Sequence, residues 1–174
     1  LGWENASECM VLVELLNAIR LSRIALHART GKQQYKGHPD LEAFQGFYEL
    51  CQHPLYYNGG IESLSDIRQI LIRFPLLKGV FIGRGLLSSP LLAKEFKGNE
   101  TFLPEQRMSI YFAFHEELFS AYSQVLQGET QLLVKMKTLW EYFLPETDRK
   151  LLKRIKKSTR LQQYTESVKA IFTS

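Results

Sequence analysis

The sequence is poor in cysteine and has no long uncharged apolar run. Its 174 residues include 2 cysteines. A membrane-spanning helix needs about 18 consecutive apolar residues, and no apolar run in the sequence is that long. The first residues also lack the basic and apolar regions of a secretory signal. Cys9 and Cys51 lie in apolar patterns typical of helices, so we expect reduced thiols rather than a disulfide or a metal pair. These absences argue against a membrane protein and favour a cytoplasmic one.

Histidine is also scarce, with 4 residues in the chain. His38 and His53 each precede a proline and are expected in loops, while His115 falls in a helical pattern. No pair has the spacing of metal ligands, so no metal site is expected. His27 stands at the end of a short apolar run, where a histidine is most often a hydrogen-bonded structural residue.

The formal net charge of +4 is modest, but the basic residues are concentrated near the C-terminus. Lys150, Lys153, Arg154 and Lys157 fall at i, i+3, i+4 and i+7 and therefore share one face of a helix. Such a stripe is often only a solvated surface. Its density here also suits several phosphate groups, which predicts salt-dependent binding of RNA.

The first part of the chain alternates between helical and strand patterns. Helices are expected over 6–21, 40–51 and 63–74, and strands over 23–28, 54–58 and 79–82. Asp40 would cap the second helix, and Ser63 or Ser65 the third. Because a helix fills each crossover, we expect the strands to pair in parallel.

Beyond residue 98 no strand pattern follows, and we expect a bundle of helices. Thr147 is positioned to cap the helix that carries the basic stripe, and a last helix runs over 161–172. The predicted domains are therefore 1–97 and 98–174, an α/β part and an all-α part. An aromatic group is expected in the core of the bundle rather than on a base-stacking surface. It comprises Tyr111, Phe112, Phe114, Phe119 and Tyr122.

Two glycine-rich turns follow the second and third strands. The first contains Asn58, Gly59 and Gly60, and the second contains Gly83 and Arg84. Glycine lets backbone N–H groups approach an anion, and an arginine adds a charged fork. Either turn alone would be an ordinary turn. Together they predict a phosphate site of the kind found at the last strands of a (β/α)8 barrel.

The order of these motifs resembles the flavin-dependent tRNA-dihydrouridine synthases. The resemblance rests on LHART at 26–30 with QYKG at 34–37, YNGGI at 57–61, and VFIGRGL at 80–86 with Pro90. The first three residues resemble the end of the family's segment around its fifth strand. GET at 128–130, KMK at 135–137 and WEY at 140–142 are most similar to the subfamily called type C.

The resemblance implies the last three strand–helix units of a TIM barrel, followed by a helical domain that recruits tRNA. Family members reduce the C5–C6 double bond of a tRNA uridine with FMN, which NADPH or NADH reduces in turn. His27 would contact the flavin or the uracil, and Arg29 would hold the RNA substrate. Asn58, Gly59, Gly60, Gly83 and Arg84 would enclose the FMN phosphate, and Lys150, Lys153, Arg154 and Lys157 would bind tRNA.

Part of the family pattern is absent from this sequence. Three strands cannot close a barrel, and the family's proton-donor cysteine has no counterpart at Cys9 or Cys51. We therefore expect a fragment of a longer enzyme, inactive by itself and binding FMN weakly or not at all. If the short chain is native, self-association would cover its open sheet edge. The alternatives are a non-catalytic RNA-binding module with a vestigial half-barrel, and another FMN- or phosphate-binding barrel enzyme.

Overall fold

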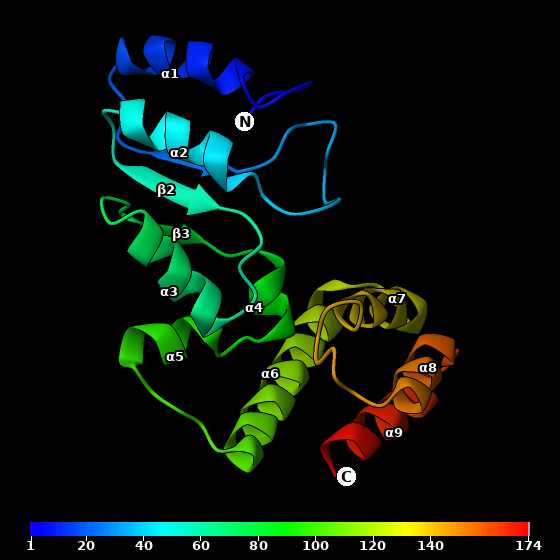
Figure 1. Ribbon diagram of the computed structural model, residues 1–174. Helices are drawn as coiled ribbons and strands as arrows, with labels where there is room; N and C mark the ends of the chain where they lie inside the picture. The colour runs from blue at the N-terminus through cyan, green and yellow to red at the C-terminus, as the bar shows by residue number, and fades with distance from the viewer. Residues whose placement is uncertain (174) are drawn as a thin grey trace. The chain divides into compact units, whose positions relative to one another are not determined.

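A computed structural model describes residues 1–173 (Figure 1). The chain forms two compact units, Leu1–Gly85 and a second that begins at Leu86. The predicted domain boundary near residue 98 stays a prediction, since the compact units themselves divide before the helix α5 (Leu92–Gly98).

The first unit is a parallel sheet with a helix in each crossover. Its elements are α1 (Glu8–Asn17), β1 (Ile24–His27), α2 (Leu41–Leu50), β2 (Leu55–Asn58), α3 (Leu64–Arg73) and β3 (Gly79–Phe81). The strands lie in chain order, β1-β2-β3, and both pairs are parallel. The parallel pairing predicted from the alternation is thus confirmed, and the order is that of consecutive strands in a (β/α)8 barrel.

Local sequence explains where two of these helices begin. The Asp40 carboxylate accepts a hydrogen bond from the Ala43 N–H at 2.9 Å, as the sequence predicted. Ser63, rather than Ser65, caps α3 in a reciprocal capping box with Asp66. The prediction for the first helix was too long, since α1 ends at Asn17 instead of residue 21.

The helices cover one face of the sheet. Phe44 of α2 packs edge-on against Tyr57 of β2 and against Phe74, with ring centroids 4.9 and 5.0 Å apart. Strand side chains alternate between faces, so Tyr57 is buried while its neighbour Tyr56 is only half-buried on the other face. That second face ends in a row formed by His27, Asn58 and Phe81, in which Phe81 is 44% exposed.

The first residues of the chain lie beside the continuation of β1. Gly2 and Thr30 form an isolated parallel bridge. The Gly31 N–H donates to the Gly2 carbonyl at 2.7 Å, and the Lys32 N–H donates to the Trp3 carbonyl at 3.0 Å. This position fits the predicted resemblance of residues 1–3 to the end of a preceding barrel strand.

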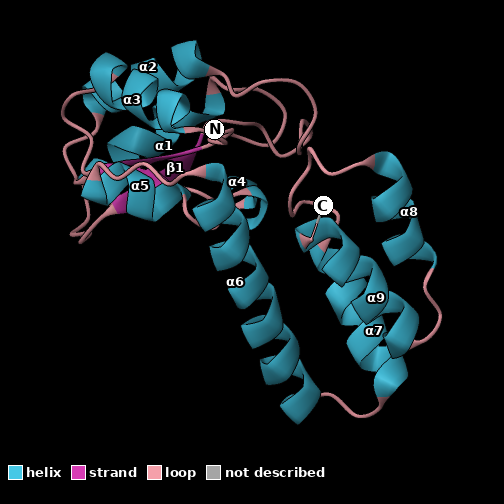
Figure 2. Cartoon of the chain, turned by 90° about the horizontal axis from the view of Figure 1, so that it is seen from below, coloured by secondary structure: helices cyan, strands magenta, loops and turns pink. Residues whose placement is uncertain are grey.

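Within residues 1–173 no strand follows β3. The short helix α4 (Arg84–Ser88) runs across the division between the units. The second unit then contains α5, α6 (Pro104–Val125), α7 (Glu129–Leu139), α8 (Arg149–Lys157) and α9 (Leu161–Phe172), as Figure 2 shows. The last helix has the predicted bounds. The predicted cap of α8 was wrong. Asp148 caps the helix in place of Thr147, because its carboxylate accepts hydrogen bonds from the backbone N–H groups of Lys150 and Leu151.

Aromatic side chains form the core of the second unit, which confirms the prediction for the group at 111–122. Tyr111 is buried, and the other four pack against the same core. A polar network runs through this core. The Trp140 indole N–H donates to the Tyr164 hydroxyl at 2.9 Å, and that oxygen lies 2.7 Å from Nε2 of His115. Burial lowers the pKa of His115, so its ring is neutral at pH 7.

Cys9 is buried and Cys51 is partly buried, and both are free thiols. In the described part of the chain no helix has the length and apolar character needed to cross a membrane.

Candidate functional site

The predicted site residues of the sheet unit meet at the carboxyl ends of the strands. His27, Asn58 and Phe81 occupy the same register row at the ends of β1, β2 and β3. A cavity of about 240 Å³ opens there. It is lined by His27, Arg29, Tyr35, Asn58, Gly59, Gly60, Ile61, Glu62, Phe81, Gly83, Arg84 and Gly85. The structure therefore brings together all the residues predicted to hold the cofactor.

The turn after β2 requires glycine for two reasons. Gly59 and Gly60 have φ of +151° and +55°, conformations that side chains rarely adopt. Pro39 also packs closely behind the turn, because a Cβ at Gly60 would lie 3.0 Å from Cγ of Pro39. Pro39 thus restrains the turn, and the same two glycines line the cavity.

The turn after β3 supplies the charged group. A Cβ at Gly83 would meet no atom within 4 Å, so the backbone there borders open space. The guanidinium of Arg84 lies over the ring of Tyr35, 4.6 Å from its centroid. This cation–π contact joins the β3 turn to the loop that follows β1. Glu62, an exposed acid, lies on the cavity rim and partly offsets the positive charge.

Arg29 is buried, and its side chain organises the loop that follows β1. Its guanidinium donates to the carbonyl oxygens of Lys36 at 2.8 Å and Gly37 at 2.9 Å. Gln33 donates from its amide nitrogen to the carbonyl of Lys36 as well, at 2.9 Å. Arg29 thus positions the loop that carries Tyr35, and its contact with RNA stays a prediction.

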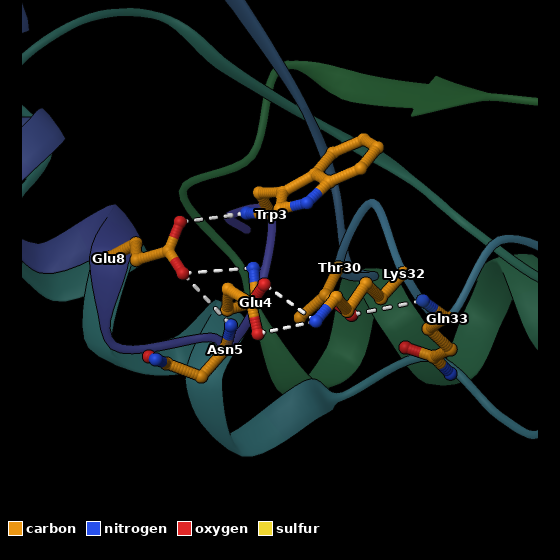
Figure 3. Close-up of polar contacts among 7 residues, drawn as sticks. All are labelled: Trp3, Glu4, Asn5, Glu8, Thr30, Lys32 and Gln33. Atoms are coloured by element: carbon orange, nitrogen blue, oxygen red, sulfur yellow. Dashed lines mark hydrogen bonds and ion pairs between the residues drawn. The ribbon is translucent and has the colours of Figure 1, made fainter.

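The start of the same loop is held by the N-terminal segment (Figure 3). The Glu8 carboxylate accepts hydrogen bonds from the backbone N–H groups of Trp3, Glu4 and Asn5 at 2.8 to 3.0 Å. These bonds lower the pKa of Glu8. Glu4 in turn pairs with Lys32 of the loop at 2.6 Å. Residues 3–8 therefore form a base for the loop beside the cavity.

The environment of His27 favours the neutral form of its ring. Burial, and then the positive charge of Arg29, lower the pKa of its imidazole below the ordinary value. A neutral ring has one nitrogen donor and one acceptor, so it can hydrogen-bond either to a ring carbonyl or to a ring N–H.

Five of the residues that line the cavity were not among the predicted site residues, namely Tyr35, Ile61, Glu62, Phe81 and Gly85. Tyr35 and Phe81 belong to motifs that carry the family resemblance, but no site role was predicted for them, although an exposed aromatic residue near glycine turns is a usable signal. Gly85 has a packing role, since a Cβ there would lie 2.2 Å from the Ile61 carbonyl oxygen. This close approach depends on the relative position of two turns, and the sequence alone does not give it.

We expect Gly85→Ala to destabilise the sheet unit by about 1–3 kcal/mol, the usual range for overpacking. The new methyl group would push the β3 turn away from the backbone at Ile61 and Glu62. Urea unfolding followed by circular dichroism measures the change. Gly83→Ala is the matched control, because its Cβ enters open space, and an equal loss in both variants would contradict the packing argument.

The second predicted site lies on the helical unit. Lys150, Lys153, Arg154 and Lys157 are exposed, and all four line a groove of about 430 Å³ between α8 and α9. Ile155, on the opposite side of α8, is fully buried and attaches the helix to the core. The predicted common face of the four basic residues is thus confirmed, whereas RNA binding there stays a prediction.

Among the described residues no group of three or more histidine, cysteine or acidic side chains is arranged to hold a metal ion.

The sequence model of the family described as "Dihydrouridine synthase (Dus)" matches residues 1–173 and so covers both units. The chain is 34% identical over 97 residues to a probable tRNA-dihydrouridine synthase of Aquifex aeolicus, which is 56% of this chain and 30% of that protein. It is 27% identical over 105 residues to the tRNA-dihydrouridine(16) synthase of Escherichia coli, 60% of this chain and 33% of that protein.

The latter is a type C synthase, the subfamily that the sequence suggested. A type B synthase of Vibrio cholerae matches too, at 26% identity over 112 residues, 62% of this chain and 34% of that protein. The matched segment spans about a third of each of these curated relatives. Since the family pattern extends over nearly all of the chain, the chain belongs to the dihydrouridine synthase family.

Proposed function

We propose that the protein carrying this chain is a flavin-dependent tRNA-dihydrouridine synthase, which reduces the C5–C6 double bond of a uridine in tRNA. One observation carries the proposal. In a chain of this family, a cavity lined by glycines and Arg84 opens at the carboxyl ends of parallel strands. Barrel enzymes commonly bind phosphate groups at this end of the sheet. In this proposal the sheet unit is part of the barrel, and the helical unit binds the tRNA.

The residues present suit the phosphate end of FMN. The backbone at Gly83 borders open space, and Gly59, Gly60 and Arg84 line the same cavity. Backbone N–H groups with a guanidinium are the donor set that a phosphate takes. The cavity volume of about 240 Å³ is smaller than that of typical pockets for drug-sized ligands, which start at about 300 Å³. The cavity therefore accommodates the phosphate end, and the ring system needs further walls.

Bound FMN, reduced by NADPH or NADH, would supply the hydride. The residues of this chain would bind and orient. Neutral His27 would hydrogen-bond to the flavin or the uracil from the end of β1. Arg29 would act through the loop that it holds, because its guanidinium already bonds to the carbonyls of Lys36 and Gly37.

A proton donor is not supplied by either cysteine. Cys9 lies in α1, and its thiol donates to the Ala6 carbonyl at 2.9 Å. Cys51 follows the end of α2, away from the carboxyl ends of the strands. We therefore propose that residues 1–174 alone hold FMN weakly and do not reduce uridine. A purified sample of this chain should be colourless, with no flavin absorption band.

The proposed function is tested on the longest reading frame that carries this chain. The purified product should contain FMN and form dihydrouridine in tRNA. Arg84→Ala should weaken FMN binding about 10- to 100-fold, the usual effect of losing a hydrogen bond to a charged group. Flavin fluorescence, which changes when FMN binds, measures the affinity.

Arg23→Ala is the matched control, since Arg23 is exposed at the opposite end of β1. Equal FMN affinities of the two variants would contradict the phosphate site. A full-length product that binds tRNA but neither contains FMN nor modifies uridine would instead support the RNA-binding module.

A further inference from the structure

The groove between α8 and α9 has two chemically different walls. It is lined by Lys150, Lys153, Arg154, Lys157 and Ser158 on one side and by Gln163, Glu166 and Ser167 on the other. The first wall is strongly basic. The second wall carries an amide and a carboxylate, which a simple phosphate-binding groove does not need. Figure 1 shows the two helices next to each other near the C-terminus.

Gln163 lines the groove, and the oxygen end of its side-chain amide is already bonded. Its side-chain oxygen accepts hydrogen bonds from the backbone N–H of Thr159 at 3.1 Å and from the Thr159 hydroxyl at 3.3 Å. The backbone N–H can only donate, so its bond assigns the oxygen end of the amide. The –NH₂ end has no hydrogen-bond partner within residues 1–173, so its donors are available to a ligand.

Glu166 lies one helical turn after Gln163 and supplies an acceptor. Its Oε1 accepts a hydrogen bond from the side-chain amide of Gln162 at 3.0 Å, and no bond to Oε2 is formed within the described chain. The α9 wall therefore offers a donor and an acceptor side by side. This pair complements the hydrogen-bonding edge of a nucleobase, for example N3 and the N4 amino group of cytosine.

Charge separates the roles of the two walls. A phosphate group against α8 is attracted by four cations, whereas one against α9 would meet the Glu166 carboxylate. The α9 wall is thus unsuited to a second phosphate and suited to a neutral base that donates to the carboxylate. The volume of about 430 Å³ lies within the range of small-molecule pockets.

The walls are also held in place. The Lys137 ammonium of α7 donates to the carbonyl of Ser158, just beyond the end of α8. The Ser158 hydroxyl donates to the backbone carbonyl of Ile155 at 2.6 Å, and the Ile155 side chain is fully buried. On the other side, Tyr164 and Val168 anchor α9 in the core. A groove with anchored walls can select the orientation of what it binds.

We propose that this groove holds one unpaired nucleotide of the RNA, with its phosphate on α8 and its base on Gln163 and Glu166. The proposal rests on the proposed binding of RNA by the helical unit and goes beyond it, because it assigns the α9 wall to a base. Bases that are splayed out of a helix are the usual targets of such readout in RNA.

The test compares two polyanions, a five-nucleotide single strand of cytidylate and a short inorganic polyphosphate, which has charge but no bases. Glu166→Ala should lower the affinity for oligocytidylate about tenfold, because the base loses its acceptor. The same variant should bind polyphosphate more tightly, since one repelling charge is removed. Calorimetric titration at one fixed salt concentration measures both, and the gain for polyphosphate also shows that the variant is folded.

Glu117→Ala is the control, because Glu117 is an equally charged, exposed residue on α6 outside the groove. It should change both affinities in the same direction and only slightly. If Glu166→Ala instead raised both affinities, the base-reading role would be wrong while RNA binding by α8 would stand. If removing the basic residues of α8 left RNA affinity unchanged, the proposed RNA contact itself would fail.

Discussion

Replacing Lys150, Lys153, Arg154 and Lys157 together with alanine is expected to lower the affinity of this chain for tRNA by roughly 10²- to 10³-fold at about 0.1 M salt. Four phosphate contacts release about 3 condensed counterions, and the gain from that release is lost with the cations. The slope of log affinity against log salt should therefore become shallower by about 3. A salt titration of tRNA binding by fluorescence anisotropy gives both quantities.

The comparison needs a variant that loses the same charge elsewhere on the helical unit. It carries alanine at Lys94, Lys97, Lys135 and Lys169, all of which are exposed and lie outside the α8/α9 groove. If general electrostatic attraction dominates, the two variants will lose affinity equally. An unchanged salt slope in the α8 variant would contradict the assignment of this face to RNA. Retained helicity by circular dichroism excludes unfolding as the cause.

Local signals explain the part of the fold that the sequence predicted well. Helix α3 follows from the capping box of Ser63 and Asp66, and β2 from a short apolar run bounded by Pro54 and Gly59. These signals involve residues close in sequence. Where two adjacent residues offered a similar cap, as Thr147 and Asp148 did, the pattern favoured the wrong one, because the entry angle of the chain decides which side chain reaches the free N–H groups.

The first helix shows a different limit. Met10, Val11, Val13 and Leu15 suggested one long apolar helix against a sheet, yet Val13 is buried while Val11 and Leu15 are 68% and 64% exposed. Apolar residues on several sides of a helix do not indicate which side faces the sheet. The periodicity thus predicted the helix correctly and its buried face only in part.

The candidate site divides in the same way. The residue type alone was enough to predict Gly59, Gly60 and Gly83 as site residues, since a turn near an anion needs residues without a side chain. The stacking of Arg84 on Tyr35 and the bonds from Arg29 to residues 36 and 37 depend on the path of a loop. The family resemblance suggested Arg29 as a substrate contact. The hydrogen bonds of Arg29 add a second role, the positioning of the loop, which could not be predicted from the residue pattern.

The second large effect is expected from Tyr164→Phe, which should destabilise the helical unit by about 2–5 kcal/mol. Tyr164 is fully buried, and its hydroxyl serves both the Trp140 indole N–H and the His115 ring. Removing one oxygen leaves two buried polar groups without a partner, each costing about 1–3 kcal/mol. Phenylalanine preserves the ring packing against Phe119, so the loss reports on the hydrogen bonds rather than on a cavity.

The chain contains 2 tryptophans, one in each unit, which makes the measurement specific. In a Trp3→Phe background, urea unfolding followed by selectively excited tryptophan fluorescence reports on Trp140 in the helical core. Tyr142→Phe removes the same atom from a side chain that is 37% exposed, and its effect should stay within about 0.5 kcal/mol. Equal stability of the Tyr164 and Tyr142 variants would show that the buried network contributes nothing beyond packing. A selective loss in Tyr164→Phe, with α8 and α9 still helical, would show that the polar core stabilises the unit that carries the α8/α9 groove.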